Sequence, residues 1–485
     1  MINKSSVQAI ILAAGRSTRF KIGQTKLSFL ICGQEMILYP VKLFQKLNIP
    51  VCLVVGYQKE VVKAIIERSG IATTFVEQTE QKGTAHAVAC SRQHWFADEI
   101  IIMAGDSPLV SEDVIQELLE THYKTRATIT FISAHNSDPS LRGYGRIVKR
   151  GSSICIIEKS DPRYDDLDNQ CCINSGIYIV KRSFLETYLN QIKPDPETKE
   201  LYLTEIIHQA CCAGLKVEMI HVPFDVIRGV NTLKELWTVE HIKRSELISY
   251  WMSQGVRFST AQHVHIDVDV TLGVGTFIGT GVVLLQGTNI GAHCTIDAGS
   301  VIGNTTIGDH TNILPHSVIY DSVIGSNCNV GPMAHIRKGS VVGDHSYIGN
   351  FVEVSASKIG AYTKAKHLSY LGNANVGSHV NIGAGTITCN YDGVKKHETC
   401  ILDGAFIGSN NALIAPVTIG KESLTAAGST ITENVPDFAL AIARGQQVNK
   451  EQGATRIRER LMQQKSQESV VNTVTAKTVI PSDHP

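Results

Sequence analysis

The chain has 485 residues, with 45 lysines and arginines against 45 aspartates and glutamates, so its formal net charge is zero. This length predicts two or three domains, each with a core of its own. The balanced charge excludes the basic surplus of a nucleic-acid-binding or membrane-surface protein, and no apolar run approaches the roughly 18 residues of a membrane-spanning helix.

The N-terminus and the cysteines bear on the cellular compartment in which the protein is expected. Residues 1–14 lack the layout of a signal peptide, because the apolar run Ala9–Leu12 has the length of a strand and leads into a glycine loop. The 12 cysteines are scattered or vicinal, as in Cys171-Cys172, without the Cys-x-x-Cys spacing of zinc sites. A long chain of ordinary composition does not need disulfides. We therefore expect a cytoplasmic protein with reduced thiols.

Strand and helix patterns alternate in the first half of the chain. Buried strands are predicted at Val7–Leu12, Val51–Val55 and Ile100–Met103, with helices near 37–47 and 60–68 between them. This βαβ order predicts an α/β doubly wound (Rossmann-like) sheet, whose ligands bind at the carboxyl ends of its strands.

Two of these strand ends carry residues suited to a phosphate ligand. The small residues Ala13–Gly15 follow the first strand and let backbone N–H groups face an anion, while Arg19 and Lys26 add positive charge. Asp106 follows the third strand, where a carboxylate can hold magnesium. Each feature alone is most often only a turn or a cap. Their conjunction predicts a nucleoside-triphosphate site.

The motifs of this half resemble those of sugar-phosphate nucleotidyltransferases. The matching stretches are Leu12-Ala13-Ala14-Gly15-x-x-Thr18-Arg19, Lys26, Gln78, Gln81–Ala87, Gly105–Leu109, Gly143–Ile147, Glu158-Lys159, Ile173–Tyr178 and Gly229–Asn231. In this order they are similar to the uridyltransferase half of the bifunctional N-acetylglucosamine-1-phosphate uridyltransferases / glucosamine-1-phosphate acetyltransferases.

The resemblance implies a role for each matching position. Leu12, Ala13, Ala14, Gly15, Lys26 and Asn231 bind UTP or the UDP-sugar; Gln78, Gly83 and Thr84 hold uracil; Gly145, Glu158 and Asn174 hold the acetylated sugar; Asp106 and Asn231 bind Mg²⁺. Arg19 and Lys26 are the implied catalytic cations, which neutralise the phosphates while the sugar 1-phosphate attacks the α-phosphorus and pyrophosphate leaves. The glycine loop is also spelled this way in enzymes that use cytidine or guanosine triphosphate, and Gln78 with Gly83-Thr84 favours uracil.

The chain departs from the family pattern at four positions of this half. Ser17 stands for a glycine, Thr25 for a proline, Ala104 for an aromatic residue and Cys172 for an acidic residue.

Residues 229–255 are predicted to form a linker helix that ends at Gly255. Apolar residues recur near helical spacing between charged ones, at Leu233, Leu236, Trp237, Ile242, Leu247 and Ile248. We interpret this stripe, Trp237 included, as packing rather than as a ligand site.

From His263 to Val435 an aliphatic residue returns every six positions, often followed by glycine, as in Ile324-Gly325 and Val330-Gly331. A period of six fits neither a helix nor a long strand, but it fits a solenoid in which three hexapeptide repeats close one triangular coil. A β-sandwich would show turn signals at intervals of about 8–12 residues instead. Residues 256–445 are therefore predicted to form a parallel β-helix.

Three functions compete for such a solenoid: an acyltransferase, a zinc hydratase and a scaffold for oligomerisation. A hydratase needs three converging histidines, and those of this region are scattered over separate coils, where we expect solvated turn residues. The acyltransferase hypothesis rests on the runs Gly349–Glu353, Lys364–Gly372 and Asn381–Gly393, the last of which breaks the hexapeptide rhythm and predicts a projecting loop. Acetylation of an amine needs a base, and His367 is suited to that role.

These runs resemble the acetyltransferase half of the same family, whose fold is a left-handed β-helix. The resemblance implies that His367 is the general base and that Arg337, Tyr370 and Asn381 hold glucosamine 1-phosphate; Ala384, Asn390, Tyr391, Ser409, Ala427 and Arg444 line the acetyl-CoA site. It also implies a homotrimer with acetyl-CoA sites between subunits.

One departure affects the sugar-phosphate site. The family has a lysine where this chain has Ser355, and Lys366 replaces a glycine before His367. We hypothesise that Lys366, or less directly Lys358, restores the missing cation. The alternative is a weakened acetyl half, with lost phosphate binding worth about 1.5–3 kcal/mol.

The tail, residues 446–485, is polar, with a helix predicted at Glu451–Gln464 and disorder at Ser466–Pro485. Together the sequence predicts a cytoplasmic bifunctional enzyme with domains at 1–228 and 256–445. One domain acetylates glucosamine 1-phosphate from acetyl-CoA, and the other joins N-acetylglucosamine 1-phosphate to UMP from UTP. The alternatives are a nucleotidyltransferase whose β-helix acetylates weakly and one whose β-helix only trimerises.

Overall fold

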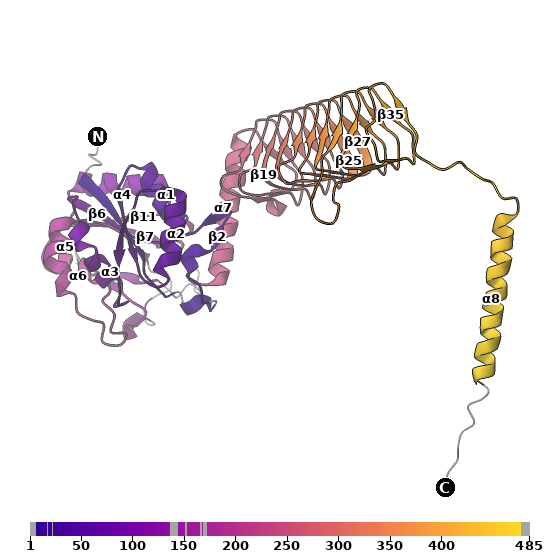
Figure 1. Ribbon diagram of the computed structural model, residues 1–485. Coiled ribbons are helices and arrows are strands. Elements are labelled where there is room, and N and C mark those ends of the chain that lie inside the picture. Colours follow the sequence, from indigo (N-terminus) through magenta and orange to yellow (C-terminus); the bar gives the residue numbers. More distant parts are fainter. Residues whose placement is uncertain are drawn as a thin grey trace, which may run out of the picture.

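The computed structural model describes residues 6–16, 18–21, 23–135, 144–150, 153–164, 167 and 172–476. Along the chain these residues form an α/β domain, a connecting helix, a rod of short strands and a terminal helix (Figure 1). Within the described ranges no helix is both long enough and apolar enough to cross a membrane.

The N-terminal domain is built on one mainly parallel sheet with the strand order β11-β7-β10-β6-β1-β4-β5, to which β8 and β9 are joined at β10. The strands are β1 (Val7–Ala13), β4 (Val51–Val55), β5 (Thr74–Glu77), β6 (Glu99–Ala104), β7 (Ile129–His135), β8 (Arg146–Arg150), β9 (Ser153–Ile157), β10 (Cys172–Lys181) and β11 (Val217–His221), besides the small hairpin β2 (Leu30–Ile31) and β3 (Gln34–Glu35). β10 is antiparallel to both β6 and β7, which the βαβ pattern did not predict.

Helices cover both faces of this sheet, as a doubly wound fold requires. They are α1 (Leu38–Lys46), α2 (Lys59–Ser69), α3 (Thr84–Cys90), α4 (Glu112–Thr125), α5 (Arg182–Tyr188) and α6 (Glu205–Cys212). Neighbouring side chains of β1 point to opposite faces, so Ile11 packs in the core with α1, α2 and α4, and Ile10 packs in the core with α3, α5 and α6. The predicted doubly wound α/β architecture is confirmed.

The helix α7 (Leu233–Ser253) lies between the domains, where a helix was predicted. Val239 is buried in the core of the α/β domain, and Ile248 is buried in the core of the rod. The prediction that Trp237 packs is wrong: its side chain is 67% exposed and stacks on His241. Leu236 and Ile242 pack on the α/β domain, Trp251 packs on the rod and Leu247 contacts both cores, so the apolar residues are divided between the two domains.

The rod is a 26-stranded parallel assembly from β12 (Arg257–Phe258) to β37 (Leu440–Ala441). Residues eighteen positions apart pair between successive coils, as in His265 with Val283 and Thr271 with Asn289. One aliphatic residue of each hexapeptide is buried, beginning with Ile266, Leu272, Ile278, Leu284, Ile290, Ile296 and Ile302. The predicted period and the predicted parallel β-helix are confirmed.

Most strands of the rod have two residues. The longer ones are β19 (Val301–Ile307), β21 (Val318–Ile324), β23 (His335–Arg337), β25 (Tyr347–Ser355), β27 (Lys364–Gly372), β28 (Ala374–Val376), β30 (Ile387–Cys389), β31 (Thr399–Ile401), β33 (Ala412–Ile414) and β34 (Val417–Ile419). Corners fall where φ is positive, and several histidines stand there: His293 (φ 56) stacks on His310 (φ 58) with ring centroids 5.2 Å apart. These two histidines pack on each other in addition to facing solvent.

Beyond the rod the chain runs extended to the helix α8 (Gly453–Ala476), which stands away from both domains (Figure 1). The helix predicted at Glu451–Gln464 is present. It continues through residues 466–476, where disorder was predicted, and that part of the prediction is wrong. Residues 477–485 lie outside the described part of the chain.

Candidate functional sites

The end of β1 opens onto a cavity of about 780 Å³ in the α/β domain. Its lining includes Leu12, Ala13, Ala14, Gly15, Lys26, Gln78, Gly83, Thr84 and Asp106. The loop after β1 is tied to the end of β4, because Tyr57 N–H donates to the carbonyl of Ala14 at 3.2 Å. At Gly56 a Cβ would approach the Cβ of Ala14 to 2.8 Å, so glycine permits this close packing. The predicted phosphate loop therefore lines a preformed cavity.

Four predicted polar residues meet at one side of this cavity. Lys26 Nζ donates to Asn231 Oδ1 at 2.9 Å and contacts Asp106 Oδ2. Arg19 Nη2 donates to the same Asn231 oxygen at 2.8 Å. The backbone joins the two loops as well, because Val230 N–H donates to the carbonyl of Asp106 at 3.0 Å. Residues more than 200 positions apart thus form one cluster.

The donor set of this cluster fits a divalent cation. A carboxylate oxygen of Asp106 and an amide oxygen of Asn231 already gather about one cation, the Lys26 ammonium. Hard oxygen ligands of this kind are those that Mg²⁺ takes, together with water and phosphate oxygens.

The predicted base-binding residues also line the cavity and are held by hydrogen bonds and close packing. Gln78 is buried, and its amide Nε2 donates to the carbonyl of Gly83 at 3.1 Å. Gly83 has φ 107, and a Cβ there would come within 2.5 Å of the Leu201 carbonyl oxygen, so this position requires glycine. Thr84 Oγ1 accepts from Leu203 N–H at 2.9 Å. These contacts fix the turn that precedes α3.

The three predicted sugar-binding residues also lie together. Asn174 N–H donates to the carbonyl of Gly145 at 2.9 Å, and a Cβ at Gly145 would lie 3.3 Å from Glu158 Oε1. Burial raises the pKa of Glu158, although Thr204 Oγ1 donates to its Oε1 at 2.8 Å. The side-chain oxygen of Asn174 is buried without a hydrogen-bond partner among the described residues. An unsatisfied acceptor in this position suits a ligand N–H or O–H group.

Sequence reasoning missed several residues that hold these groups in place. Asn174 Nδ2 donates to the hydroxyl of Tyr178 at 2.6 Å, and Gly229 N–H donates to the hydroxyl of Tyr144 at 2.8 Å. Burial raises the pKa of Tyr144 to about 12. Tyr144 and Tyr178 stand in the matched motifs, whereas nothing in the sequence marked Thr204. The contact of Asn174 with Gly145 depends on the placement of β10, which the periodicity did not indicate.

In the rod, His367 is exposed on β27 and points away from the interior. The register pairs it with Asn350 of the preceding coil, and His367 Nδ1 lies 3.0 Å from Asn350 Oδ1. An amide oxygen only accepts, so this contact places a proton on Nδ1 and leaves the lone pair on Nε2. This is the tautomer that a base acting through Nε2 needs.

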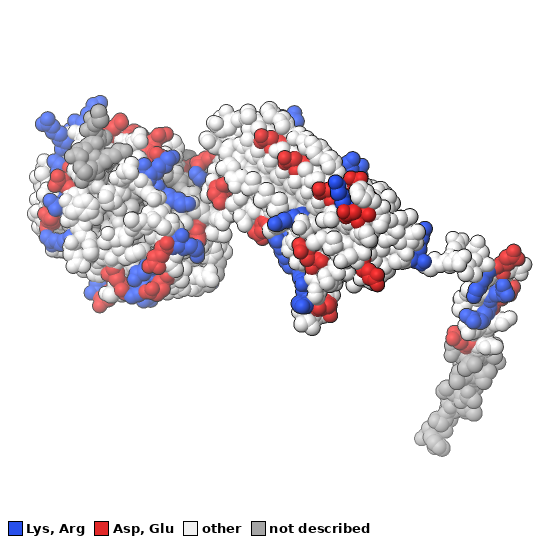
Figure 2. Space-filling view, turned by 45° about the horizontal axis from the view of Figure 1, so that its top comes forward, with Lys and Arg blue, Asp and Glu red and all other residues white. Residues whose placement is uncertain are grey.

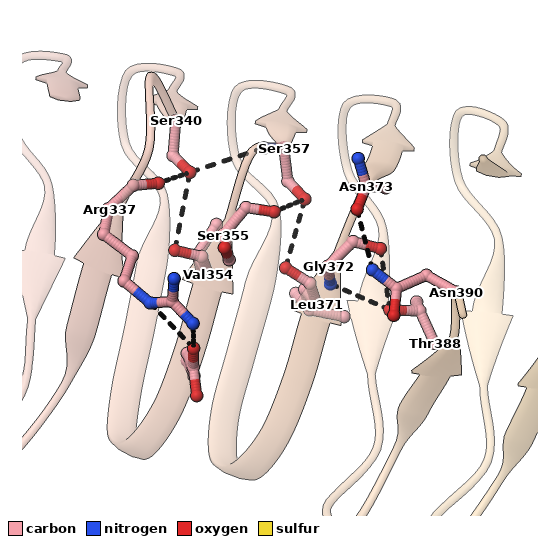
Figure 3. A network of polar contacts seen from close by, with 11 residues as sticks. Arg337, Ser340, Val354, Ser355, Ser357, Leu371, Gly372, Asn373, Thr388 and Asn390 are labelled. Carbon is pink, nitrogen blue, oxygen red and sulfur yellow. Dashed lines mark hydrogen bonds and ion pairs between the residues drawn. The ribbon is translucent and has the colours of Figure 1, made fainter. Parts of the chain in front are cut away.

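Two of the predicted sugar-phosphate residues, Arg337 and Ser355, lie on neighbouring coils (Figure 3). Arg337 pairs in register with Ser355, which pairs with Gly372 on the next coil. Arg337 Nε donates to Glu353 Oε1 at 3.0 Å, and Ser355 is buried. The hydroxyl of Tyr370 packs against Gly372, where the Cβ of any other residue would collide with that hydroxyl.

Two further predicted residues lie apart from that row. The ammonium group of Lys366 stands 5.3 Å from the ring centroid of Tyr347. The corner at Leu368 (φ 38) separates Lys366 from Tyr370. Asn381 pairs with Lys364 on one side and with Phe406 on the other. Within one chain, Lys366 and Ser355 are therefore on different faces of the rod.

Most of the residues predicted for acetyl-CoA form a column over successive coils. The carbonyl of Ala384 accepts from Asn410 N–H at 2.7 Å, Ser409 precedes Asn410, and the carbonyl of Ser409 accepts from Gly428 N–H at 2.8 Å. Arg444 Nη1 donates to the carbonyl of Ala427 at 2.8 Å. The column thus runs from Ala384 to Arg444.

The remaining two, Asn390 and Tyr391, stand at the start of a projecting loop. The loop breaks the coil period, because Asn381 pairs with Phe406, twenty-five positions on. It is closed by a bridge between Tyr391 and Lys396. The hydrogen bond from His397, with help from backbone N–H groups of the loop, lowers the pKa of Asp392 to about 2. The predicted loop is present and internally braced.

Comparison with known proteins adds family evidence. A family model described as a MobA-like NTP transferase domain matches residues 9–157, and one described as a GMPPB C-terminal domain matches residues 260–370. The chain is 43% identical over 459 residues to the "Bifunctional protein GlmU" of Geotalea daltonii, covering 92% of this chain and 98% of the relative.

Other relatives with the same name agree. The protein from Geotalea uraniireducens is 40% identical, covering 92% of this chain and 98% of the relative, and that from Clostridium botulinum strain 657 is 40% identical, covering 91% and 97%. A solved structure of UDP-glucose pyrophosphorylase complexed with UDP-glucose is 16% identical with a TM-score of 0.41, covering 49% of this chain and 98% of that one, which is too low to bear on the fold.

Proposed function

The chain belongs to the family of bifunctional GlmU proteins, and from that premise we propose how its residues divide the two reactions. The protein is a bifunctional transferase of UDP-N-acetylglucosamine biosynthesis: it acetylates glucosamine 1-phosphate and transfers a uridylyl group from UTP to N-acetylglucosamine 1-phosphate. The observation that carries this function is that the chain matches its relatives, which are named bifunctional, over nearly their whole length. The same chain holds both residue clusters described above.

For uridylyl transfer we assign the cavity of residues 1–228. Backbone N–H groups after β1 and the cations Arg19 and Lys26 face the triphosphate, so negative charge that builds up on the transferring phosphate is neutralised in place. Gln78, Gly83 and Thr84 receive the base, and Glu158 and Asn174 receive the acetylated sugar. Asp106 and Asn231 would hold Mg²⁺, which when bound supplies charge neutralisation for the phosphates. The chain's own contribution is to position two anions for in-line attack.

For acetyl transfer we assign residues 256–445. His367 takes the proton from the amino group of glucosamine 1-phosphate through Nε2, with Asn350 holding the ring. Arg337, Tyr370 and Asn381 bind the sugar phosphate, and the column from Ala384 to Arg444 with the loop at Tyr391 binds acetyl-CoA.

We further propose a homotrimer in the cytoplasm. The rod exposes many large apolar side chains, and broad areas of its visible face carry no charge (Figure 2). The exposed apolar side chains of the rod include Val323, Val341, Phe351, Leu368, Phe406 and Leu424. Apolar surface of this extent favours association of rods side by side. Sedimentation of the full chain would test the trimer, and a monomeric mass would contradict it.

Two assays test the assigned chemistry. Release of free coenzyme A from acetyl-CoA in the presence of glucosamine 1-phosphate is expected; its absence would leave a nucleotidyltransferase with a rod that only assembles. Release of pyrophosphate is expected with UTP, and release with CTP alone would reverse the base assignment.

The replacement Glu158→Gln is expected to stabilise the protein and to weaken its binding of N-acetylglucosamine 1-phosphate. Desolvation raises the pKa of Glu158, so ionising this partly buried carboxyl group costs the folded state free energy, and stability is lost as pH rises through its folded pKa. Glutamine stays neutral, so the melting temperature of the variant should exceed that of the wild type at pH 8, and the difference should disappear at low pH. The KM for N-acetylglucosamine 1-phosphate should rise about 10- to 100-fold, because a charged hydrogen-bond acceptor is lost. A stability difference that does not change with pH would contradict this account.

The replacement Lys366→Ala tests the hypothesis that this lysine compensates for Ser355. Because Lys366 and Ser355 lie on different faces within one chain, the compensating contact would have to be made across the proposed trimer. If it is made there, the KM for glucosamine 1-phosphate should rise about tenfold or more, with a smaller change in kcat, because one phosphate contact is removed. Lys358→Ala tests the second candidate cation and should change the KM less. If Lys366→Ala leaves the KM unaltered and Ser355→Lys lowers it, the site lacks a compensating cation and the acetyl half is weakened.

A further inference from the structure

Outside the assigned sites, three side chains of the types that bind metal ions converge at the ends of neighbouring strands of the α/β sheet. His135 ends β7, Cys172 begins β10 and His221 ends β11, and one ligand atom of each lies within 4.8 Å of the other two. The rings of His135 and His221 are stacked with centroids 5.5 Å apart. Cys172 Sγ lies 3.6 Å from His135 Nδ1.

The sheet itself brings these residues to one face. β10 pairs Cys172 directly with His135, and β11 pairs His221 with Ser133, two positions before His135. Paired residues, and residues two apart on one strand, point to the same side of a sheet. The convergence therefore follows from the register of three neighbouring strands and not from the setting of one loop.

A hydrogen-bond chain fixes one imidazole in the form that binds metal. Ser133 Oγ donates its only proton to the carbonyl of Ile220 at 2.9 Å, so it can only accept from His221 Nδ1, which lies 2.8 Å away. The proton of His221 is thus on Nδ1, and the lone pair is on Nε2. An imidazole oriented through its second nitrogen is the usual arrangement around a protein-bound metal.

We propose that His135, Cys172 and His221 form a site for a borderline-soft transition metal ion of the zinc class. One thiolate and two imidazoles suit zinc and its neighbours in the first transition row, and they do not suit magnesium. His135 and His221 are exposed, so a fourth position is open to water. Asn174 lies two residues beyond Cys172 on β10, and a bound ion would therefore tie the strand of the sugar-binding asparagine to β7 and β11.

Cobalt and zinc titrations of the full chain test this site. Co²⁺ should give a thiolate-to-metal charge-transfer band that saturates at one equivalent, and Zn²⁺ but not excess Mg²⁺ should displace it. Cys172→Ser should abolish the band, and His221→Ala should weaken binding at least tenfold. Ser133→Ala, which leaves the three ligands in place, should weaken it less.

The matched control is Cys212→Ser on α6. Cys212 is an exposed thiol whose Sγ lies 3.5 Å from His208 Nε2, a Cys–His pair outside the three-ligand group. This variant should bind Co²⁺ like the wild type. The proposal is overturned if Cys172→Ser and His221→Ala, with unfolding curves like the wild type, keep the band, or if Cys212→Ser removes it.

Discussion

Asp106→Asn is expected to lower kcat/KM for uridylyl transfer by about 10²–10³, the size of effect seen when one preorganised electrostatic group is removed from an active site. The carboxylate has two tasks in the proposed site. It faces the Lys26 ammonium, and with Asn231 it supplies the oxygens for Mg²⁺. Asparagine keeps the shape but removes the charge, so both the cation and the lysine are held less firmly.

The form of the loss distinguishes this account from a general defect. The concentration of Mg²⁺ that gives half-maximal activity should rise in Asp106→Asn, and acetyl transfer by the same preparation should stay unchanged, because we assign that reaction to the rod. Asp98→Asn is the matched control: Asp98 precedes the same strand at its other end, with an exposed ion pair to Arg182 at 3.5 Å. An exposed pair contributes little, so activity should be retained. Equal losses in both variants would contradict the assignment of Asp106.

Periodicity predicted the rod well because every hexapeptide adopts the same local structure. One aliphatic residue turns inward at every sixth position, from Ile266 onwards, and its neighbours eighteen positions away do the same. The pattern is repeated many times, so single exceptions do not obscure it. The projecting loop could be predicted for the same reason, because it is a visible break in a regular sequence.

The α/β domain could be predicted only in part. Strand ends indicated Ala13–Gly15 and Asp106, since parallel strands place their carboxyl ends at one edge. The antiparallel β10 could not be foreseen, because its partners are set by tertiary packing and not by its own pattern. Its register brings Asn174 to Gly145 and Cys172 to His135, so the structure was needed for both groupings. The resemblance to a family supplied the residue roles that physical patterns alone left open.

His367→Asn is expected to lower kcat for acetyl transfer by about 10²–10⁴, the usual contribution of a positioned general base. The KM for glucosamine 1-phosphate should change little, because Arg337, Tyr370 and Asn381 are assigned to its binding. The rising limb of the pH profile should disappear together with the rate. Uridylyl transfer should be unaffected, which shows that the variant is folded.

His379→Asn provides the matched control, because His379 is an exposed histidine on the following coil, at a corner with φ 59. Asparagine tolerates that backbone conformation, so acetyl transfer should stay within about twofold of the wild type.

A second variant tests the role of Asn350, whose amide oxygen faces His367 Nδ1. Asn350→Asp places a negative charge beside the imidazole and favours its protonated form, so the rising limb of kcat/KM should move to higher pH. A general base must be unprotonated to act, and for that reason a shift to lower pH, or none, would contradict its assignment to His367. Steric damage at Asn350 would reduce the rate at every pH without moving the limb. The direction of the shift therefore separates proton transfer at His367 from a merely structural role for the pair.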